Sequence, residues 1–560
     1  MPIGVQTLES IISSEGLYVD KTRYIYELIK DRAPKRYFLS RPRRFGKSLT
    51  CSTLEAIFLG KRELFKGLAI DTLPYDWEKR PVIHIDFSKI DHATADELKK
   101  GLDSVLDQQA REVNLTLEEK LLGRKFAELI EKLARTQGNV CVVIDEYDKP
   151  IVDLIDKPEH AEQSRMILKS FYGVLKGTDA FIHFLFITGV SRFSKVSLFS
   201  DLNNFDDVTI DERADALVGY TDAEIDHYLH DHIQVLAEKR GENYEQTRQL
   251  LRTWYNGYRF TKTLTKVYNP FSLHNCLTKL DLDNYWFASG TPTFLIKWIK
   301  NNPAIAADIT TVDGSFFAAS NLENFNIDSY YQNFKTVLMQ TGYLTFASDY
   351  DEVARGYSVA YPNEEVRYSM TEQIMHFVGK VTPENFGIFG SKFTKALAAD
   401  DLGLFCKHMQ DYIKLIPHTI VVDREMFYQQ IFFMMCVLFG KRSAVEVEVA
   451  TEEGYMDLLM EGAHCTFVIE FKRNQTPDIA LAQIERKRYW ERFAIDAAKK
   501  IVLAGITFNT TAAGVQVLLK TKFVVPAKEC HPDSDPGPRS RLSRRATPDA
   551  VGDRDDRQKR

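Results

Sequence analysis

Residues 37–48 read YFLSRPRRFGKS, an apolar run that leads into Gly46-Lys47-Ser48 and then into the apolar-periodic segment 49–59. A strand, a loop and a helix in this order predict a cradle for nucleotide phosphates, because free backbone N–H groups gather at the helix N-terminus. Lys47 supplies an ammonium group for the terminal phosphates, and Ser48 supplies a hydroxyl for Mg²⁺. The residues expected to contact the nucleotide here are Arg43, Arg44, Phe45, Gly46, Lys47, Ser48 and Leu49.

This loop departs from the usual phosphate-binding pattern at its first position. In G-x-x-x-x-G-K-[ST], the first glycine falls on Arg41. The tight turn is therefore expected from Pro42, Arg43 and Arg44. Because Gly-Lys-Ser also occurs by chance, an ordinary surface turn is an alternative interpretation of this fragment alone.

A second pattern lies at residues 140–146, which read VCVVIDE. A continuous apolar run of this length is typical of a strand buried on both faces of a parallel sheet. We expect Asp145 to hold Mg²⁺ through its water shell and Glu146 to polarise the attacking water. A buried strand that ends in a charged turn is the alternative. The occurrence of both patterns in one chain favours a nucleotide site.

Two further apolar runs, 81–87 and 181–192, alternate with amphipathic segments. This alternation predicts a parallel sheet whose ligand site lies at the carboxyl ends of its strands. Thr188, Ser191 and Arg192 follow such an end. One of them is expected to sense the γ-phosphate or to stabilise charge in the transition state. Arg192 is the expected nucleotide contact among the three. A solvated loop is equally compatible with all three.

These phrases resemble the bacterial AAA-ATPase-like proteins, a family of predicted P-loop ATPases. The resemblance is carried by RPRRFGKSL (41–49), VIDEYDKP (143–150), TGVSRFS (188–194), WYNGY (254–258) and YNPFS (268–272). It covers most of residues 1–290 and implies an ATP-dependent motor or switch with ATP and Mg²⁺ as cofactors. It does not supply a substrate.

The composition is that of a multi-domain protein of 560 residues with 72 basic and 78 acidic side chains. The net charge of -6 excludes a global attraction to nucleic acid, so any such binding needs a local patch. Seven scattered cysteines without a C-x-x-C pair indicate reduced core residues. No apolar run approaches the roughly 20 residues of a membrane span, and the first residues lack a basic leader, so we expect a cytoplasmic protein without membrane contact.

The fold class expected from these patterns is α/β. A P-loop NTPase parallel sheet (1–215) precedes a helical lid (216–284), in which Thr221 to Glu224 resembles a capping box. A linking region of unknown role (285–420) follows, and its aromatic residues Tyr285, Trp286 and Phe287 are expected in the core. A second α/β domain spans 421–525. Residues 526–560, rich in Pro, Asp, Arg and Ser, are expected to be a disordered tail.

The second α/β domain carries its own constellation of polar residues. A helix at 426–439, strands at 444–449, 455–460 and 465–472, a helix at 480–493 and a strand at 500–506 are expected. Glu470 and Lys472 share one face of a strand, and the hairpin brings Asp457 beside them.

Carboxylates of this kind are hard oxygen ligands that suit Mg²⁺, and an adjacent ammonium can orient a metal-bound water. Asp457 and Glu470 are the expected metal ligands, as are Ser48 and Asp145 in the nucleotide site. Glu425, Glu446 or Glu448 could complete the shell, and Gln483 could hold the lysine or a phosphate.

This arrangement resembles the PD-(D/E)XK nuclease superfamily, which implies a restriction-endonuclease-like domain. On that resemblance Asp457 is the motif aspartate, Glu470 and Lys472 are the E-x-K, and Gln483 with Tyr489 matches the trailing helix. Tyr455 departs from the pattern, because relatives often carry a basic residue there. The implied catalytic residues are Asp457, Glu470, Lys472 and Gln483, together with Glu146 of the ATPase.

The leading hypothesis is an ATP-binding and hydrolysing protein with a Mg²⁺-dependent nuclease domain that cleaves nucleic-acid phosphodiesters, with DNA as the expected substrate. The alternative is an ATP-controlled switch whose C-terminal module binds nucleic acid or protein without cleavage. A plain scaffold would require both constellations to be coincidental. A homo-oligomeric ring suits an ATPase of this type, although the sequence assigns no arginine finger.

Overall fold

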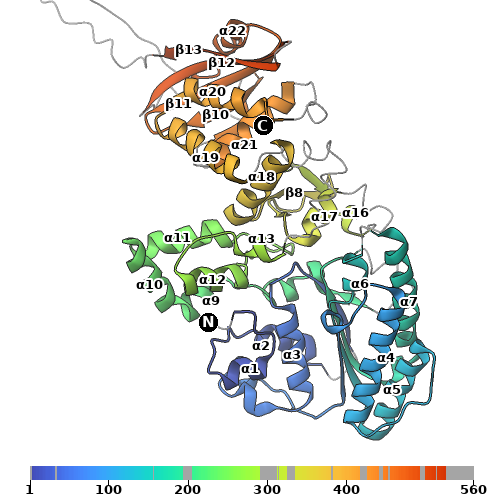
Figure 1. The fold of residues 1–560 in the computed structure, drawn as a ribbon. Helices are drawn as coiled ribbons and strands as arrows, with labels where there is room; N and C mark the ends of the chain where they lie inside the picture. Colours follow the sequence, from blue (N-terminus) through green and yellow to red (C-terminus); the bar gives the residue numbers. More distant parts are fainter. Residues whose placement is uncertain are drawn as a thin grey trace, which may run out of the picture.

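A computed structural model describes most of the chain. The described residues are 3–31, 35–154, 157–192, 198, 205–290, 312, 314–323, 334–379, 383–416, 425–439, 445–451, 454–491, 499–511 and 514–524. The tail expected at 526–560 lies outside them. Figure 1 shows the N-terminal sheet and its helices at one end, the C-terminal sheet at the other, and the linking region between them.

The N-terminal sheet is parallel, as the alternating pattern predicted. Its strands are β1 (Lys35–Ser40), β2 (Val82–Asp86), β3 (Val140–Asp145), β4 (Ile182–Gly189) and β5 (Asp206–Asp207), in the order β2-β3-β4-β1-β5. Ser40 pairs with Gly189, and Asp86 pairs with Asp145, so these strands end along one edge. All six residues of β3 are buried, which explains its uninterrupted apolar run.

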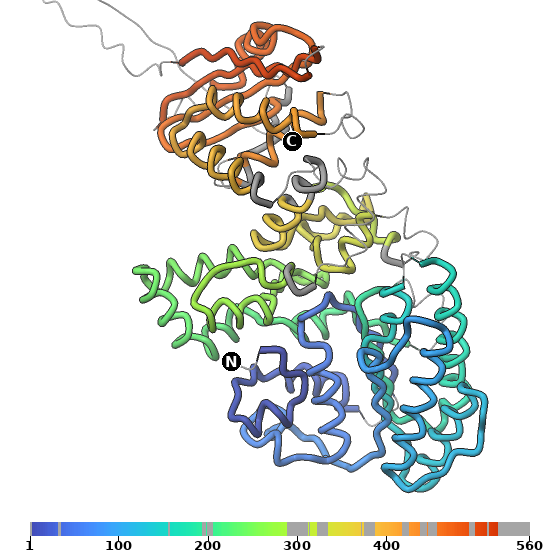
Figure 2. Tube along the Cα trace, in the orientation of Figure 1, coloured from blue at the N-terminus to red at the C-terminus, as the bar shows by residue number. Residues whose placement is uncertain are grey.

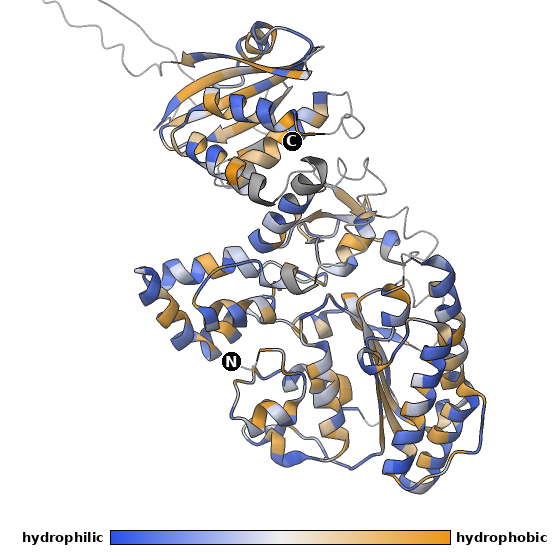
Figure 3. Cartoon of the chain, viewed as in Figure 1, coloured by the Kyte–Doolittle hydropathy of each residue, from blue (hydrophilic) through white to orange (hydrophobic). Residues whose placement is uncertain are grey.

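Helices cover both faces of this sheet. On one side lie α1 (Leu8–Ser13), α2 (Thr22–Ile29) and α3 (Lys47–Phe58), and on the other lie α4 (Ala95–Glu112), α5 (Leu122–Gln137), α6 (Lys149–Val152) and α7 (Pro158–Gly177) (Figure 1). The long helices turn hydrophobic residues toward the strands and hydrophilic ones outward (Figure 3). Burial of these amphipathic faces forms the main core.

The lid consists of α9 (Asp222–Tyr228), α10 (His230–Arg240), α11 (Tyr244–Tyr255) and α12 (Pro270–Lys279). The predicted capping box is confirmed, because the Thr221 side chain accepts from the Glu224 amide while the Glu224 carboxylate accepts from the Thr221 amide. Figure 2 shows the N-terminal segment close to this lid. The ion pair between Lys21 and Glu224, 2.6 Å long, joins the two parts.

The linking region forms a small mixed unit. It contains α13 (Tyr285–Gly290), β6 (Phe316–Ala318), α16 (Ser320–Glu323), α17 (Phe334–Thr341), β7 (Thr345–Phe346), β8 (Gly356–Ala360) and α18 (Glu364–Gly379). β8 pairs antiparallel with β6 and β7. Tyr285, Trp286 and Phe287 are buried, which confirms the expectation that they belong to the core.

The C-terminal sheet is mixed, with the order β13-β12-β11-β10-β9. Its strands are β9 (Val445–Thr451), β10 (Gly454–Glu461), β11 (Cys465–Arg473), β12 (Lys500–Thr511) and β13 (Gly514–Val524), and only β11 and β12 pair in parallel. The connection between them carries α22 (Pro477–Lys487), which packs on one face. The helix α21 (Glu425–Phe439) packs on the other, where Phe432 meets Phe471.

Three elements that pack in this domain were not expected from the sequence. The strand β13 follows the predicted last strand as an antiparallel edge. The helices α19 (Pro383–Ala398) and α20 (Leu402–Ile413), which precede the expected boundary at 420, pack against α21 and β13 respectively. At the corner between them, Asp400 accepts hydrogen bonds from the amides of Ala463 (2.8 Å), His464 (2.5 Å) and Cys465 (3.1 Å) in the β10–β11 turn.

Within the described ranges, no helix combines the length and the apolar character needed to cross a bilayer. Six described cysteines are free, and five of them are buried, in agreement with the expectation that they are reduced core residues.

Candidate nucleotide and nuclease sites

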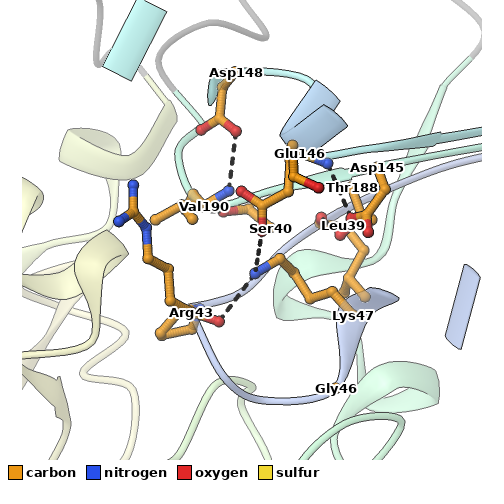
Figure 4. A network of polar contacts seen from close by, with 12 residues as sticks. Leu39, Ser40, Arg43, Gly46, Lys47, Asp145, Glu146, Asp148, Thr188 and Val190 are labelled. Carbon is orange, nitrogen blue, oxygen red and sulfur yellow. Dashed lines mark hydrogen bonds and ion pairs between the residues drawn. The ribbon is translucent and has the colours of Figure 1, made fainter. Parts of the chain in front are cut away.

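The phosphate loop lies at the carboxyl end of β1, where the chain turns into α3. Gly46 has φ 104° and stands directly before the helix, and Arg44 also lies in the left-handed region with φ 71°. Lys47 is buried, and its Nζ donates to the Pro42 carbonyl at 3.1 Å and lies 3.6 Å from the Glu146 carboxylate (Figure 4). The ammonium group of Lys47 therefore lies between the loop and the end of β3, where the γ-phosphate of a nucleotide is expected.

Arg41, at the position of the missing glycine, has a structural role. Its side chain is 1% exposed and donates to the carbonyls of Ser40 (2.9 Å), Thr209 (2.5 Å) and Ala214 (2.9 Å). The guanidinium also lies 4.7 Å from the Phe260 ring centre. Burial lowers the pKa of Arg41 to about 9. Arg41 thus attaches the start of the loop to residues 209–214, while the left-handed turn falls three residues later, at Arg44.

The acidic end of β3 fits a divalent cation. Asp145 is buried, and burial followed by the nearby Glu146 carboxylate raises its pKa to about 6, although a hydrogen bond from the Ser48 hydroxyl favours the ionised form. Such a carboxylate gains from a neighbouring cation, which would replace its proton. Ser48 and Asp145, the two predicted ligands, are therefore brought together. Glu146 (φ 53°) turns out of the strand.

The end of β4 is held by hydrogen bonds. Asp148 accepts from the amides of Val190 (3.2 Å) and Ser191 (2.7 Å), and Thr188 donates to the Leu39 carbonyl at 2.8 Å (Figure 4). The Ser191 hydroxyl also donates to Asp148. Arg192 donates to Asp207 at 2.5 Å and lines a small cavity of about 40 Å³ together with Arg41 and Pro42, and it is not among the residues that line the cavity over residues 43–50. In this arrangement, a nucleotide contact by Arg192 would require its release from Asp207.

A cavity of about 310 Å³ opens over the phosphate loop. This volume is within the range of small-ligand sites. Residues 43–50 form one wall together with Glu146, so the seven contacts predicted around Gly46 all line it. The segments 3–6 and 17–19 form a second wall. A third consists of residues 217–220 with Pro270, Phe271 and His274.

Several residues of this cavity were missed by sequence reasoning. Lys149 lines it beside Glu146 and pairs with Asp153 (2.5 Å), which also binds Arg43 (3.3 Å). Lys149 belongs to the motif DEYDKP, which begins at Asp145. Its closeness to Asp145 in the sequence was the signal that could have identified Lys149 as a cavity residue. Burial lowers the pKa of His274 to about 4, which leaves a neutral ring hydrogen-bonded to Tyr220 at 3.2 Å. No local pattern marks His274 or Tyr220 as cavity residues.

The second site lies on the C-terminal sheet. In the antiparallel pair β10–β11, Leu458 faces Ile469, so the next positions, Asp457 and Glu470, face each other. Asp457 accepts from the Phe471 amide at 2.7 Å. The Glu470 side chain is 2% exposed; burial, followed by the Asp457 charge, raises its pKa to about 7. The hairpin therefore brings the two predicted carboxylates together.

Lys472 and Gln483 complete this site around one oxygen of Glu470. The Lys472 ammonium donates to Glu470 Oε1 at 2.9 Å and to the Phe471 carbonyl at 2.8 Å, and the Gln483 amide also donates to Glu470 Oε1. A side chain at Gly505 would place its Cβ 2.2 Å from the Pro477 carbonyl, so this glycine lets α22 approach the sheet closely enough for Gln483 to reach Glu470. Buried Tyr489 hydrogen-bonds to Gln483.

The donor set fits a divalent cation in one specific respect. Among the side chains that the structure describes, Glu470 Oε2 is buried without a hydrogen-bond partner, while Oε1 is held by Lys472 and Gln483. A buried anionic oxygen without a partner is costly unless a cation neutralises it. Among the described residues, no three acidic, histidine or cysteine side chains form a metal-binding group. The side chains of Glu446, Glu448 and Tyr455 lie outside the description.

The backbone register places one further position of β9 beside Asp457, because Met456 pairs with Val449 and Leu458 pairs with Val447. Position 448 of β9 therefore faces position 457. Glu425, at the start of α21, contributes to the raised pKa of Lys472 through its charge, although the bond to Glu470 contributes more. Of the three additional acids that the sequence suggested, Glu425 is the one whose side chain is described near the site.

Comparison with known proteins agrees with this division into two sites. Residues 2–199 match the AAA-ATPase-like family, described as predicted AAA-ATPase, and residues 423–516 match the PD-(D/E)XK nuclease superfamily. An uncharacterized protein in the vnfD 5' region of Azotobacter chroococcum mcd 1 is 33% identical over 529 residues, which cover 92% of this chain and 97% of that protein. A solved structure, the Aeropyrum pernix ORC2 protein in its ADP form, matches 63% of this chain and 91% of its own with 11% identity and a TM-score of 0.28.

The strand-loop-helix at Lys47, the acidic end of β3 and the Asp457–Glu470–Lys472 hairpin lie within the matched ranges. The relative from Azotobacter chroococcum extends the match over nearly the whole chain. The chain belongs to the predicted AAA-ATPase family and carries a C-terminal domain of the PD-(D/E)XK nuclease superfamily.

Proposed function

We propose that this protein binds and hydrolyses ATP and that its C-terminal domain cleaves DNA phosphodiesters with the help of Mg²⁺. The observation that carries the nuclease assignment is the state of Glu470. One of its oxygens is held by Lys472 and Gln483, and the other, opposite Asp457, is buried without a hydrogen-bond partner within the described part of the chain. Such a group is costly in a hydrophobic core, and a bound divalent cation would offset this cost.

In the ATPase, the N-terminus of α3 and Lys47 would bind the phosphates in the 310 Å³ cavity. Ser48 and Asp145 would hold Mg²⁺, which screens the phosphate charge when bound. Glu146 lines the same cavity with its carboxylate 3.6 Å from Lys47 Nζ. A γ-phosphate bound by Lys47 would separate this ion pair, and Glu146 would then orient the attacking water.

In the nuclease, Asp457 and Glu470 would hold the Mg²⁺, which when bound polarises the scissile phosphate and favours ionisation of a water. Lys472 offsets negative charge on the phosphate and orients the nucleophile. Gln483 keeps Glu470 Oε1 in place, so that Oε2 is the oxygen left for the cation. Because the pKa of Glu470 is about 7, cation binding competes with a proton near neutral pH.

A cleavage assay on labelled single- and double-stranded DNA and RNA, with and without ATP and Mg²⁺, tests both parts. We expect Mg²⁺-dependent cleavage of DNA by the wild type and none by Lys472→Ala, with unchanged ATP hydrolysis. The matched control is Lys520→Ala, which removes an exposed lysine of the same domain that pairs with Asp478. Cleavage by Lys472→Ala at the wild-type rate would contradict the nuclease assignment.

A second candidate function is an ATP-controlled switch whose C-terminal module binds nucleic acid or protein without cleavage. It is favoured by the full engagement of Lys472 with Glu470 and the Phe471 carbonyl, and by the small acid set among the described side chains. In the same assay, this function predicts ATP-dependent retention of DNA or of a protein partner without any Mg²⁺-dependent product.

A further inference from the structure

The phosphate loop is held from outside by the linking region. The indole Nε1 of Trp286, in α13, donates to the Arg43 carbonyl at 3.0 Å, and the ring is 1% exposed. Tyr343 packs on the same indole, with ring centres 5.1 Å apart. A Cβ on Gly342 would lie 2.7 Å from Pro42 and 3.3 Å from the Trp286 ring. The backbone of the loop is therefore in direct contact with residues about 240 to 300 positions later.

Trp286 is also fixed at its backbone. Its amide donates to the carboxylate of Glu365 at 2.7 Å, and the same oxygen accepts from the Ser272 hydroxyl at 2.9 Å. Glu365 is fully buried near the start of α18, while Ser272 belongs to the lid helix α12. One carboxylate therefore connects the lid, α13 and α18, and the Trp286 side chain extends this connection to the phosphate loop.

We infer that Trp286 is a positioning residue for the proposed ATP site, an inference that rests on the proposed function. The loop lacks the glycine that normally lets it curl around the phosphates, and Arg41 holds only its first residue in place. The Trp286 indole supplies the hydrogen bond that sets the carbonyl of Arg43, one residue before the left-handed turn at Arg44. The loop conformation that accepts phosphate thus depends on the linking region.

This dependence links the two domains in space. The helix α18 packs against α21 of the C-terminal domain. At the first residue of α21, Glu425 acts electrostatically on Lys472. A continuous series of contacts therefore runs from the phosphate loop through Trp286 and Glu365 to the helix beside the proposed nuclease site. A positioning role predicts that loss of the indole N–H alone weakens ATP binding, whereas a core role predicts that aromatic packing is sufficient.

The test compares full-length Trp286→Phe with the wild type and with Trp254→Phe. The Phe side chain keeps an aromatic ring against Tyr343 but has no N–H, and Trp254 lies in the lid helix α11 away from the cavity lining. The probe is N-methylanthraniloyl-ATP, titrated by fluorescence, together with kcat and KM for ATP and the thermal midpoint. We expect about 5- to 30-fold weaker binding and a raised KM in Trp286→Phe only, because the carbonyl of Arg43 loses a buried partner.

The possible results separate the inference from the function on which it rests. Equal affinity in all three proteins would overturn the positioning role and leave the ATPase intact. Failure of the wild type to bind the probe would remove the proposed function and the inference with it. If Trp286→Phe folds poorly, the tryptophan emission of wild type and of Trp254→Phe decides: the inference requires the same nucleotide-dependent change in both proteins, and its absence refutes it.

Discussion

The replacement of Glu470 by Gln gives the sharpest prediction, because it removes a buried charge and keeps the shape of the side chain. The Glu470 side chain is 2% exposed, and its pKa rises from 4.5 to about 7 through burial and the Asp457 charge. At about 1.4 kcal/mol for each pKa unit, the ionised group destabilises the folded domain by at most about 3.5 kcal/mol. This is a large fraction of the stability of a domain.

The sign of the pH dependence follows from the direction of the shift. Below pH 4.5 the carboxyl group is protonated in both folded and unfolded chains, so no penalty exists. Between pH 4.5 and about 7 the unfolded chain has released a proton that the folded chain retains, so stability falls as pH rises. The amide of Glu470→Gln does not titrate. The free energy of unfolding of Glu470→Gln should therefore increase relative to that of the wild type as pH rises across this window. The variant should lose cleavage completely.

Hydrogen exchange of the β11 amides at pH 5 and pH 8, corrected for intrinsic rates, measures the opening free energy of this sheet alone. We expect the opening free energy of Glu470→Gln minus that of the wild type to be about 2 to 3 kcal/mol larger at pH 8 than at pH 5. The control is Glu485→Gln, which changes a partly exposed acid on α22 that pairs with Lys522. At pH 8, Mg²⁺ should stabilise the wild type but not Glu470→Gln. An equal difference at both pH values would refute the reasoning.

Four further substitutions test other parts of the structure. Lys47→Ala and Glu146→Gln should each abolish ATP hydrolysis, measured by phosphate release, because both side chains line the cavity. Asp400→Ala should destabilise the C-terminal domain by about 3 kcal/mol in hydrogen exchange, because three backbone amides lose a charged acceptor. Gly505→Ala should reduce cleavage at least tenfold and cost about 1 to 3 kcal/mol, because its Cβ would meet the Pro477 carbonyl and displace α22.

Each of these has an outcome that would contradict it. Normal ATP turnover in both Lys47→Ala and Glu146→Gln would place the nucleotide site elsewhere. For Asp400→Ala, unchanged protection of the β10–β11 turn would show that the helix corner does not hold the hairpin. Full cleavage by Gly505→Ala would mean that the approach of α22 does not matter for Gln483. Gly387→Ala is a suitable control for that variant, because a Cβ there meets no atom within 4 Å.

Much of both candidate sites could be predicted because its residues are close in the chain. Gly46, Lys47 and Ser48 are adjacent, and a helix start after a strand defines their geometry from local pattern alone. Asp457 and Glu470 are brought together by one short hairpin. The fold class followed from the same periodicities, since buried parallel strands and amphipathic helices leave different hydrophobic patterns.

Other features had no local signal. One wall of the nucleotide cavity is formed by residues 3–6 and 17–19, whose sequence shows no binding pattern. The expectation that Arg192 contacts the nucleotide depended on its place after β4, but the side chain turns to Asp207 across the sheet edge. The strand β13 was missed because an edge strand with a solvated face carries a weak hydrophobic pattern.

The amino-acid sequence by itself determined the two proposed sites, because phosphate cradles, acidic strand ends and E-x-K hairpins are built from residues close together in the chain. Only the tertiary structure decided how the phosphate loop is held without its first glycine. Arg41 reaches carbonyls at residues 209 and 214, and the Trp286 indole reaches the Arg43 carbonyl. These hydrogen bonds join residues more than 160 positions apart, and hydrophobic periodicity, which reports the environment of each segment separately, contains no information about which distant segments meet.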